Sequence, residues 1–366
     1  MMSTNDTRLK RLTVNVVPQQ PPGKALLIGA IPLDQQEIEL DWACILARLD
    51  WQVKLMVHGP PQVTLSDDEF SACGELRLLH PSRHSWHRMM SLTNAIRAEL
   101  AESTVDVIVA FGPQSLVATH SALAGRRRRP HIHYHAHELL VRAPMRSPIA
   151  RMATALAGRA DSYSVPEERR AIASAAAWRA SSLPLVVPNY RKSGWPRPRR
   201  RTSETIVIVD QAQALAPSLC TIIAEAFPQY RVLVLGHPLA APSRQNLESL
   251  GLVSFASLTR LLVHARVVIN PVAESESWNL RWAAPYRAAV ATACGAAQIL
   301  TRLPYTQPFF EAECAVPVPA RLTASDLVDA VTEALGAHEN LHRGAVSAYT
   351  SWCHIDPYIR ALPWLV

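Results

Sequence analysis

Short apolar runs alternate with longer segments of helical periodicity along most of the chain, and this alternation constrains the fold more than any other feature. The first unit has an apolar run at 25–28 closed by Gly29, a helical segment at 36–49 and an apolar run at 52–57. Apolar side chains recur in the helical segment at the spacing of one helix face: Ile38, Trp42, Ile45, Leu46 and Leu49. Strands that alternate with helices at this pitch predict a parallel sheet covered on both faces.

The same alternation continues beyond the first unit. Further strands are expected at 76–79, 105–110, 132–134, 206–209, 231–235, 252–255 and 267–270, and near Ile299. Helices are expected at 87–101, 114–124, 149–157, 218–226, 258–264 and 324–335, and a terminal helix at 341–355 is expected to stop at Pro357. The fold class is therefore α/β, with doubly wound sheets.

The 366 residues exceed one ordinary core and suit two domains. We expect a disordered lead-in at 1–23 and a first, acceptor-side domain at 24–188. Residues 189–204 are rich in proline and basic side chains and have no periodicity, so they are expected to form a linker. A second, donor-side domain should span 205–345, and the helix in 346–366 should cross back to the first. The two Rossmann-like domains are expected to face each other across a cleft.

Composition narrows the class of protein. No run of about 18 apolar residues is present, and the N-terminus lacks the apolar centre of a signal peptide, so we expect a cytoplasmic protein. The six cysteines form no Cys-x-x-Cys pair, which predicts reduced, mostly buried thiols. The net charge of +7 includes the run Arg126–Arg129, which forms either a solvated face or a contact with anionic lipid. No recognised nucleic-acid motif accompanies the charge, so no nucleic-acid partner is expected.

Several segments resemble, in the right order, motifs of one enzyme family. They are the first strand ending at Gly29, VDVIVAFGPQS at 105–115, HYHAHE at 133–138, ADSYSVP at 160–166, VVPN at 186–189, VLG at 234–236 and NLRWAAPYRAAVATACGAAQI at 279–299. Together they are similar to the retaining glycosyltransferases of the group-four type, which have two Rossmann-like domains (GT-B). The resemblance implies transfer of a sugar from a nucleotide-diphosphate donor to a glycan or lipid-linked acceptor.

The resemblance also assigns site residues. It places His137 at the cleft edge near the transferring sugar, with Glu138 as its acidic neighbour, and we take both as catalytic candidates. The candidate donor-binding residues are Gly29, Arg287, Asn279, Glu274, Glu276 and Gly236. The sugar nucleotide is a co-substrate, and neither a cofactor nor a metal is expected, because the chain has no Asp-x-Asp motif.

Some positions depart from the family pattern and support other hypotheses. Val290 stands where the family has a glutamate that binds the donor ribose, and 210–213 (Asp-Gln-Ala-Gln) replaces the arginine and lysine that bind the diphosphate. These departures favour a catalytically silent, glycosyltransferase-like binding or regulatory protein as the alternative. An epimerase is a third hypothesis, although no Gly-x-Gly-x-x-Gly follows the first strand.

Two further patterns leave alternatives open. His131, His133, His135 and His137 alternate along one expected strand, so all four share a face. Three interpretations are open: the histidines form a metal site, they are core or solvated residues, or they line the cleft and one of them is catalytic.

The segment 82–100 has aromatic and basic residues before an apolar helix. Packing on the sheet is favoured over a membrane interface.

Overall fold

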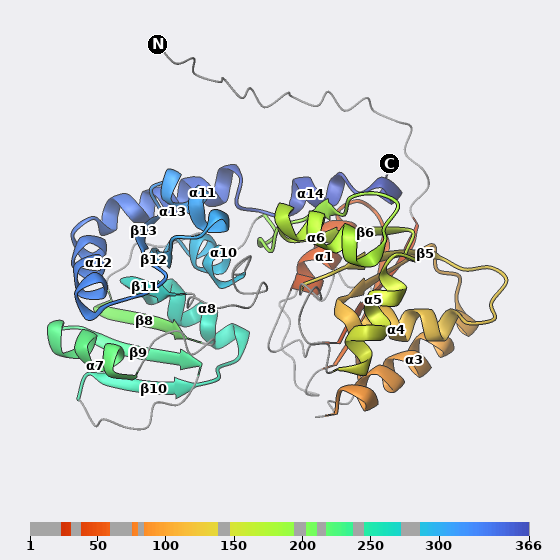
Figure 1. Cartoon of the computed structure of the whole chain (residues 1–366), viewed down its shortest axis with the longest axis horizontal. Helices are drawn as coiled ribbons and strands as arrows, with labels where there is room; N and C mark the ends of the chain where they lie inside the picture. Colours follow the sequence, from red (N-terminus) through yellow and green to blue (C-terminus); the bar gives the residue numbers. More distant parts are fainter. Residues whose placement is uncertain are drawn as a thin grey trace, which may run out of the picture.

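The computed structural model describes residues 23–30, 38–58, 75–79, 84–137, 147–193, 203–210, 217–236, 245–271 and 286–365. They form two parallel sheets, each flanked by helices, and the two sheets lie in separate lobes (Figure 1). The first lobe comes from the N-terminal half of the chain. The second comes from the C-terminal half, whose last helix returns to the first lobe (Figure 1).

The first sheet has the strand order β3-β2-β1-β4-β5-β6-β7, and every pair is parallel. Its strands are β1 (Lys24–Gly29), β2 (Gln52–His58), β3 (Glu75–Leu79), β4 (Val107–Phe111), β5 (His131–His135), β6 (Ser162–Val165) and β7 (Leu185–Val186). Its helices are α1 (Ile38–Ala47), α3 (Ser85–Glu102), α4 (Gly112–Leu123), α5 (Pro148–Ala157) and α6 (Glu168–Trp178). Leu27 of β1 packs into one core and its neighbours Leu26 and Ile28 into the other, because successive strand side chains point to opposite faces.

The second sheet has the order β10-β9-β8-β11-β12-β13 and is also parallel. Its strands are β8 (Thr205–Asp210), β9 (Arg231–Gly236), β10 (Leu247–Gly251), β11 (Val267–Asn270), β12 (Ala297–Thr301) and β13 (Ala315–Val318). The helices of this half are α7 (Pro217–Ala226), α8 (Phe255–His264), α10 (Tyr286–Ala293), α11 (Gln307–Glu311), α12 (Ala324–Gly336), α13 (His338–Ser351) and α14 (Asp356–Arg360). The predicted fold class, two doubly wound α/β units, is confirmed.

Each sheet has a point at which the strand order reverses. In the first sheet it lies between β1 and β4, and in the second between β8 and β11. Ligands of doubly wound proteins bind at the carboxyl ends of the strands next to such a point, because the connecting helices leave on opposite faces there. Two ligand-binding sites are therefore expected, one beside the strand ends Gly29 and Phe111 and the other beside Asp210 and Asn270.

Two predicted elements were wrong. The strand expected at 252–255 is instead β10, which ends at Gly251 with φ +62°. Phe255 already belongs to α8, whose cap Ser254 accepts a hydrogen bond from Ser257 N at 3.3 Å. The apolar residues at 252–255 therefore lie in a turn and a helix start. Pro357 does not end the terminal helix: α13 stops at Ser351, and Pro357 lies in the first turn of α14, where its missing N–H is not needed.

A buried ion pair joins the two halves of the chain. Arg191 lies between them in sequence, and its Nη1 is 3.1 Å from Asp41 Oδ2 in α1, with both side chains fully buried. The Arg191 guanidinium also lies 4.9 Å from the ring centre of Phe255 and donates a hydrogen bond to the hydroxyl of Tyr286. Phe255 and Tyr286 begin α8 and α10. Because α1, α8 and α10 each follow a parallel strand, the carboxyl edges of both sheets face Arg191.

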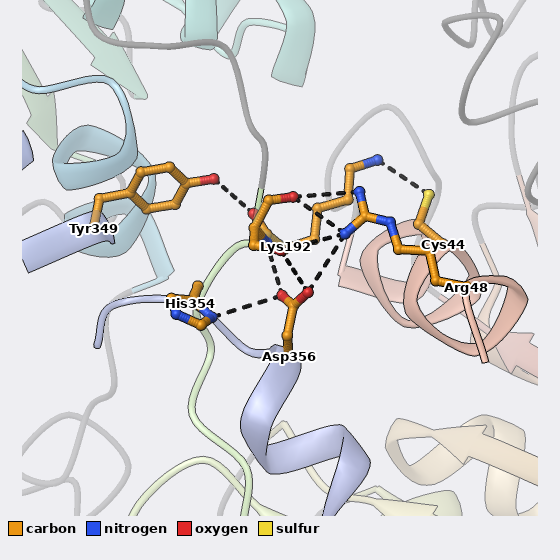
Figure 2. A network of polar contacts seen from close by, with 7 residues as sticks. Cys44, Arg48, Lys192, Tyr349, His354 and Asp356 are labelled. Atoms are coloured by element: carbon orange, nitrogen blue, oxygen red, sulfur yellow. Dashed lines mark hydrogen bonds and ion pairs between the residues drawn. The ribbon is translucent and has the colours of Figure 1, made fainter. Parts of the chain in front are cut away.

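The next linker residues are held as firmly (Figure 2). Lys192 Nζ contacts Cys44 Sγ of α1 at 3.0 Å, and the Lys192 carbonyl accepts a hydrogen bond from the Tyr349 hydroxyl of α13 at 2.6 Å. Ser193 donates from its backbone N to Asp356 Oδ2 of α14 at 2.7 Å. Residues 191–193 of the predicted linker are thus part of the contact between the halves.

Other expectations concern the thiols and the membrane. The five cysteines within the described residues are all buried free thiols, as their spacing predicted. Among the helices described, none combines the length and the apolar character needed to cross a bilayer.

Replacing Arg191 with Ala should strongly destabilise the protein. The change leaves the Asp41 carboxylate buried without its cation, which costs about 3–5 kcal/mol of unfolding free energy. Urea denaturation of the two proteins measures the difference. Arg231→Ala is the matched control, because its ion pair with Glu248 is exposed and should contribute less than about 1 kcal/mol. Equal losses for the two variants would contradict the structural role of Arg191.

Candidate functional site

His137 lies at the carboxyl edge of the first sheet, two residues beyond the end of β5. Its ring stacks on Phe111, the last residue of β4, with ring centres 5.7 Å apart and planes inclined by 17°. Its backbone carbonyl accepts a hydrogen bond from Arg170 Nη1 of α6 at 2.7 Å. Neighbouring strands and a helix therefore fix both the ring and the backbone of His137. Its catalytic role stays a prediction.

The other histidines of the row are bound to serines of β6. His133 makes hydrogen bonds of 2.8 Å with Ser162 Oγ and Ser164 Oγ, and His135 Nδ1 makes one of 2.8 Å with Ser164. Burial lowers the pKa of His133 to about 3, so its imidazole is neutral. No cluster able to hold a metal ion occurs among the residues that the structure describes. His133 and His135 are therefore core residues that orient the strand beneath His137.

An acidic residue that the sequence did not single out lies beside His137. Glu39, in the first turn of α1, is 1% exposed, and neither of its carboxyl oxygens has a hydrogen-bond partner among the residues that the structure describes. Its Oε1 lies 4.0 Å from His137 Nε2. A Cβ atom at Gly29 would come within 2.9 Å of both Glu39 Oε1 and Val57 Cγ1. Gly29 is thus needed to make room for the Glu39 carboxyl at the end of β1.

Burial sets the protonation of this pair. It raises the pKa of Glu39 to about 8. The backbone amide of Glu39 itself opposes this rise, and the nearby Asp41 carboxylate adds to it. Burial, helped by the charge of Arg170, lowers the pKa of His137 to about 3. At neutral pH the site therefore holds a mostly protonated carboxyl beside a neutral imidazole.

A signal for Glu39 was present in the sequence. Residues 38–46 of α1 are all buried, and the sequence there is apolar except for Glu39 and Asp41. A helix that is apolar on every side is buried, so its two acids must be buried as well.

At the carboxyl edge of the second sheet, two hydrogen-bond donors have no acceptor among the described residues. Asn270, the last residue of β11, is 7% exposed, and its Nδ2 has no hydrogen-bond partner. Arg287 lies in the first turn of α10, where burial lowers its pKa to about 10. Within the described part of the chain, no acid pairs with Arg287 and no acceptor binds it. Gly236 ends β9 with φ +120°, a conformation that favours glycine.

Other predicted site residues are elsewhere or outside the described part. Glu138, Glu274, Glu276 and Asn279 lie outside the described residues. Val290 is fully buried and packs in the core between α10 and α8. A glutamate at that position would therefore be buried in this core.

Comparisons with known proteins show similarity in fold only. No protein-family model matches the chain, and no curated protein matches its sequence. Among solved structures, it is similar to a sucrose-phosphate synthase from Thermosynechococcus elongatus (14% identity, TM-score 0.62, 92% of this chain and 96% of that one). Anabaena HepE in complex with UDP and glucose is similar at 14% identity and TM-score 0.61, over 92% and 97% of the chains.

A UDP-GlcNAc 2-epimerase from Neisseria meningitidis, bound to UDP-GlcNAc, also shares the fold, with 12% identity and TM-score 0.55 over 92% and 95% of the two chains. The chain has the fold of the GT-B glycosyltransferases. At these identities, the likeness establishes the architecture and leaves the activity to be argued from the residues.

Glu39 makes a testable contribution to the pH dependence of stability. The native state keeps the Glu39 proton up to about pH 8, whereas the unfolded chain releases it near pH 4.5. The native state therefore binds more protons between these values, and raising the pH lowers the free energy of unfolding by up to about 1.4 kcal/mol per unit. Glu39→Gln should lack this loss.

Urea denaturation at pH 5, 6.5 and 8 measures the effect. Glu99→Gln is the control, because the Lys54 ammonium and the Ser103 hydroxyl, opposing the effect of burial, hold the pKa of Glu99 below its ordinary value. Parallel pH profiles for the wild type and Glu39→Gln would show that Glu39 is ionised in the folded protein.

Proposed function

We propose that this protein is a retaining glycosyltransferase that moves a sugar from a nucleotide-diphosphate donor to a glycan or lipid-linked acceptor. The observation that carries the proposal is Arg287, a partly buried cation at the carboxyl edge of the second sheet with no anion beside it among the described residues. A diphosphate would supply that anion. HepE, of similar fold, was solved with UDP and glucose, which supports the choice of ligand.

The proposed reaction uses groups at the carboxyl edges of both sheets. The second domain would bind the diphosphate through Arg287 at the start of α10, where the helix dipole also favours negative charge. The first domain would present His137 to the sugar. In the proposed retaining reaction, the acceptor attacks on the face that the leaving group departs from, and the donor phosphate takes its proton. The protein then supplies orientation and charge stabilisation.

We propose that the protein also contacts the cytoplasmic face of an anionic membrane, because a lipid-linked acceptor would lie there. Trp86 and Met90 lie one turn apart in α3 and are 49% and 42% exposed. Arg126–Arg129 lie beyond the C-terminal end of α4, all exposed. Exposed aromatic and basic side chains are the groups that favour an anionic lipid surface.

One observation favours the alternative of a silent binding or regulatory protein. Val290 is part of the core, so the family's ribose-binding glutamate has no substitute at that position. Sugar transfer by the unmodified chain would exclude this alternative. Conversion of a sugar nucleotide into its epimer, with no transfer, would favour the epimerase.

Arg287→Ala should weaken nucleotide binding. Losing one charge-assisted contact to the diphosphate costs about 1.5–3 kcal/mol, so we expect the Kd for UDP to rise by about tenfold to a hundredfold. Isothermal titration with UDP measures it. Arg260→Ala, an exposed arginine of α8, is the control and should bind as the wild type does. Unchanged UDP affinity in Arg287→Ala would remove the main support for the proposal.

His137→Ala should lower turnover by about a hundredfold or more, the usual cost of losing a positioned hydrogen-bond group in the transition state. The rate of UDP release is measured with the UDP-sugar that most raises the melting temperature. His133→Ala is the comparison: His133 binds two serines in the core, so its loss should lower the melting temperature. Equal turnover in the two variants would mean that His137 is not at the reacting centre.

A further inference from the structure

Glu39 has the features of a ligand-binding group and lacks those of a structural acid. Buried carboxyls that stabilise a fold are paired, as Glu99 is with Lys54 and Ser103, and Asp41 is with Arg191. Glu39 is also buried. Its two oxygens have no hydrogen-bond partner among the described residues, and its ion-pair contact is the neutral His137 imidazole at 4.0 Å, whereas Asp41 has a permanent cation at 3.1 Å. An unsatisfied buried polar group is costly for the fold, so such groups in native proteins call for a reason. A ligand that completes the hydrogen bonds is one.

The geometry around Glu39 suits a hydroxyl group. Glu39 Oε1 and His137 Nε2 are 4.0 Å apart, which is too far for a direct hydrogen bond. One hydroxyl oxygen can lie at about 2.8 Å from both atoms, because a hydroxyl donates to one partner and accepts from another. The pair also lies beside the β1/β4 reversal point, where ligands of this fold class bind.

We propose that Glu39 and His137 form a subsite that binds a hydroxyl group of an uncharged sugar. The subsite deepens the proposed function, on which its biological meaning rests. Gly29 belongs to it as the position whose missing side chain leaves room for the Glu39 carboxyl.

The charges around the subsite select an uncharged ligand. Asp41 lies close enough to act electrostatically on Glu39, while its own cation, Arg191, is already paired with it. Arg170, whose charge acts on His137, donates a hydrogen bond to the His137 backbone carbonyl. A carboxylate buried at the subsite would therefore lie near the Asp41 carboxylate and find no uncommitted cation among the residues that the structure describes. Glucose should bind, and glucuronate should bind at least tenfold more weakly.

An uncharged sugar has two sources in a glycosyl transfer: the sugar ring of the donor and the acceptor. Both present the same hydroxyl chemistry, so the experiment separates them. A loss of affinity for UDP-glucose, with UDP unaffected, assigns the subsite to the donor ring. A loss of affinity for free glucose in the presence of saturating UDP, with UDP-glucose unaffected, assigns it to the acceptor.

The test compares the wild type, Glu39→Leu, Glu39→Gln and Glu99→Gln. Titration calorimetry gives the affinities for UDP and UDP-glucose, and saturation-transfer NMR gives those for glucose and glucuronate, each with and without UDP. Glu39→Leu should lose at least tenfold in sugar affinity and keep its UDP affinity. Glu39→Gln should stay within about threefold of the wild type, since an amide also binds a hydroxyl. Glu99→Gln is the matched control, because Glu99 is a buried glutamate at the opposite end of the sheet. This variant should bind sugar and UDP as the wild type does.

Each outcome decides one question. Wild-type sugar affinity in Glu39→Leu, an equal loss in Glu99→Gln, or equal binding of glucuronate and glucose would overturn the subsite. A wild type that binds UDP through Arg287 but no sugar in any form would also overturn it and leave the nucleotide site standing. Glucose binding that depends on Glu39, in a protein that binds no nucleotide, would support the subsite and refute the proposed function.

Discussion

The buried ion pair between Asp41 and Arg191 is the interaction on which the arrangement of the two halves depends. One charge belongs to the first helix of the first domain, and the other to the segment that joins the domains. Burying two charges is favourable only when both are paired and further contacts complete the set. The rings of Phe255 and Tyr286 provide these contacts from the second domain. A pair that depends on three separate parts of the chain forms only when all three are in place.

Helix α1 connects this pair to the candidate site. Asp41 and Cys44 are three residues apart in α1, and Arg48 directly follows the helix, four residues after Cys44 and bonded to its carbonyl. The three lie on one side and contact Arg191, Lys192 and Asp356. Glu39 is two residues before Asp41, which turns it by about 200° to the opposite side, toward Gly29 and His137. One buried helix thus places a charged side chain in the domain contact and another at the edge of the sheet. A shift of α1 along its axis would disturb both.

The sequence predicted the fold better than the site, for physical reasons. Parallel strands buried on both faces leave apolar runs that are easily found, and these predicted the two doubly wound sheets. The strand expected at 252–255 was wrong because apolar residues also occur in turns and at helix starts, and only Gly251 and the cap Ser254 separate these cases. The apolar segment 38–46 indicated that Glu39 is buried, but its proximity to Gly29 and His137, which are distant in sequence, is a tertiary contact. No local pattern records such a contact.

The charges of the two domains suggest how they divide the binding of one ligand. The second domain holds a cation, Arg287, that no described residue neutralises, and the first holds an acid, Glu39, that burial keeps protonated. A ligand with an anionic end and an uncharged, hydroxyl-bearing end would satisfy both groups at once, and a sugar nucleotide has these two ends. Neither group gains from binding the opposite end: a diphosphate beside Glu39 would be buried near the Asp41 carboxylate, whose cation Arg191 is already paired, and a neutral sugar would leave Arg287 uncompensated. In the proposed complex, these two side chains would set the orientation of the sugar nucleotide across the two domains.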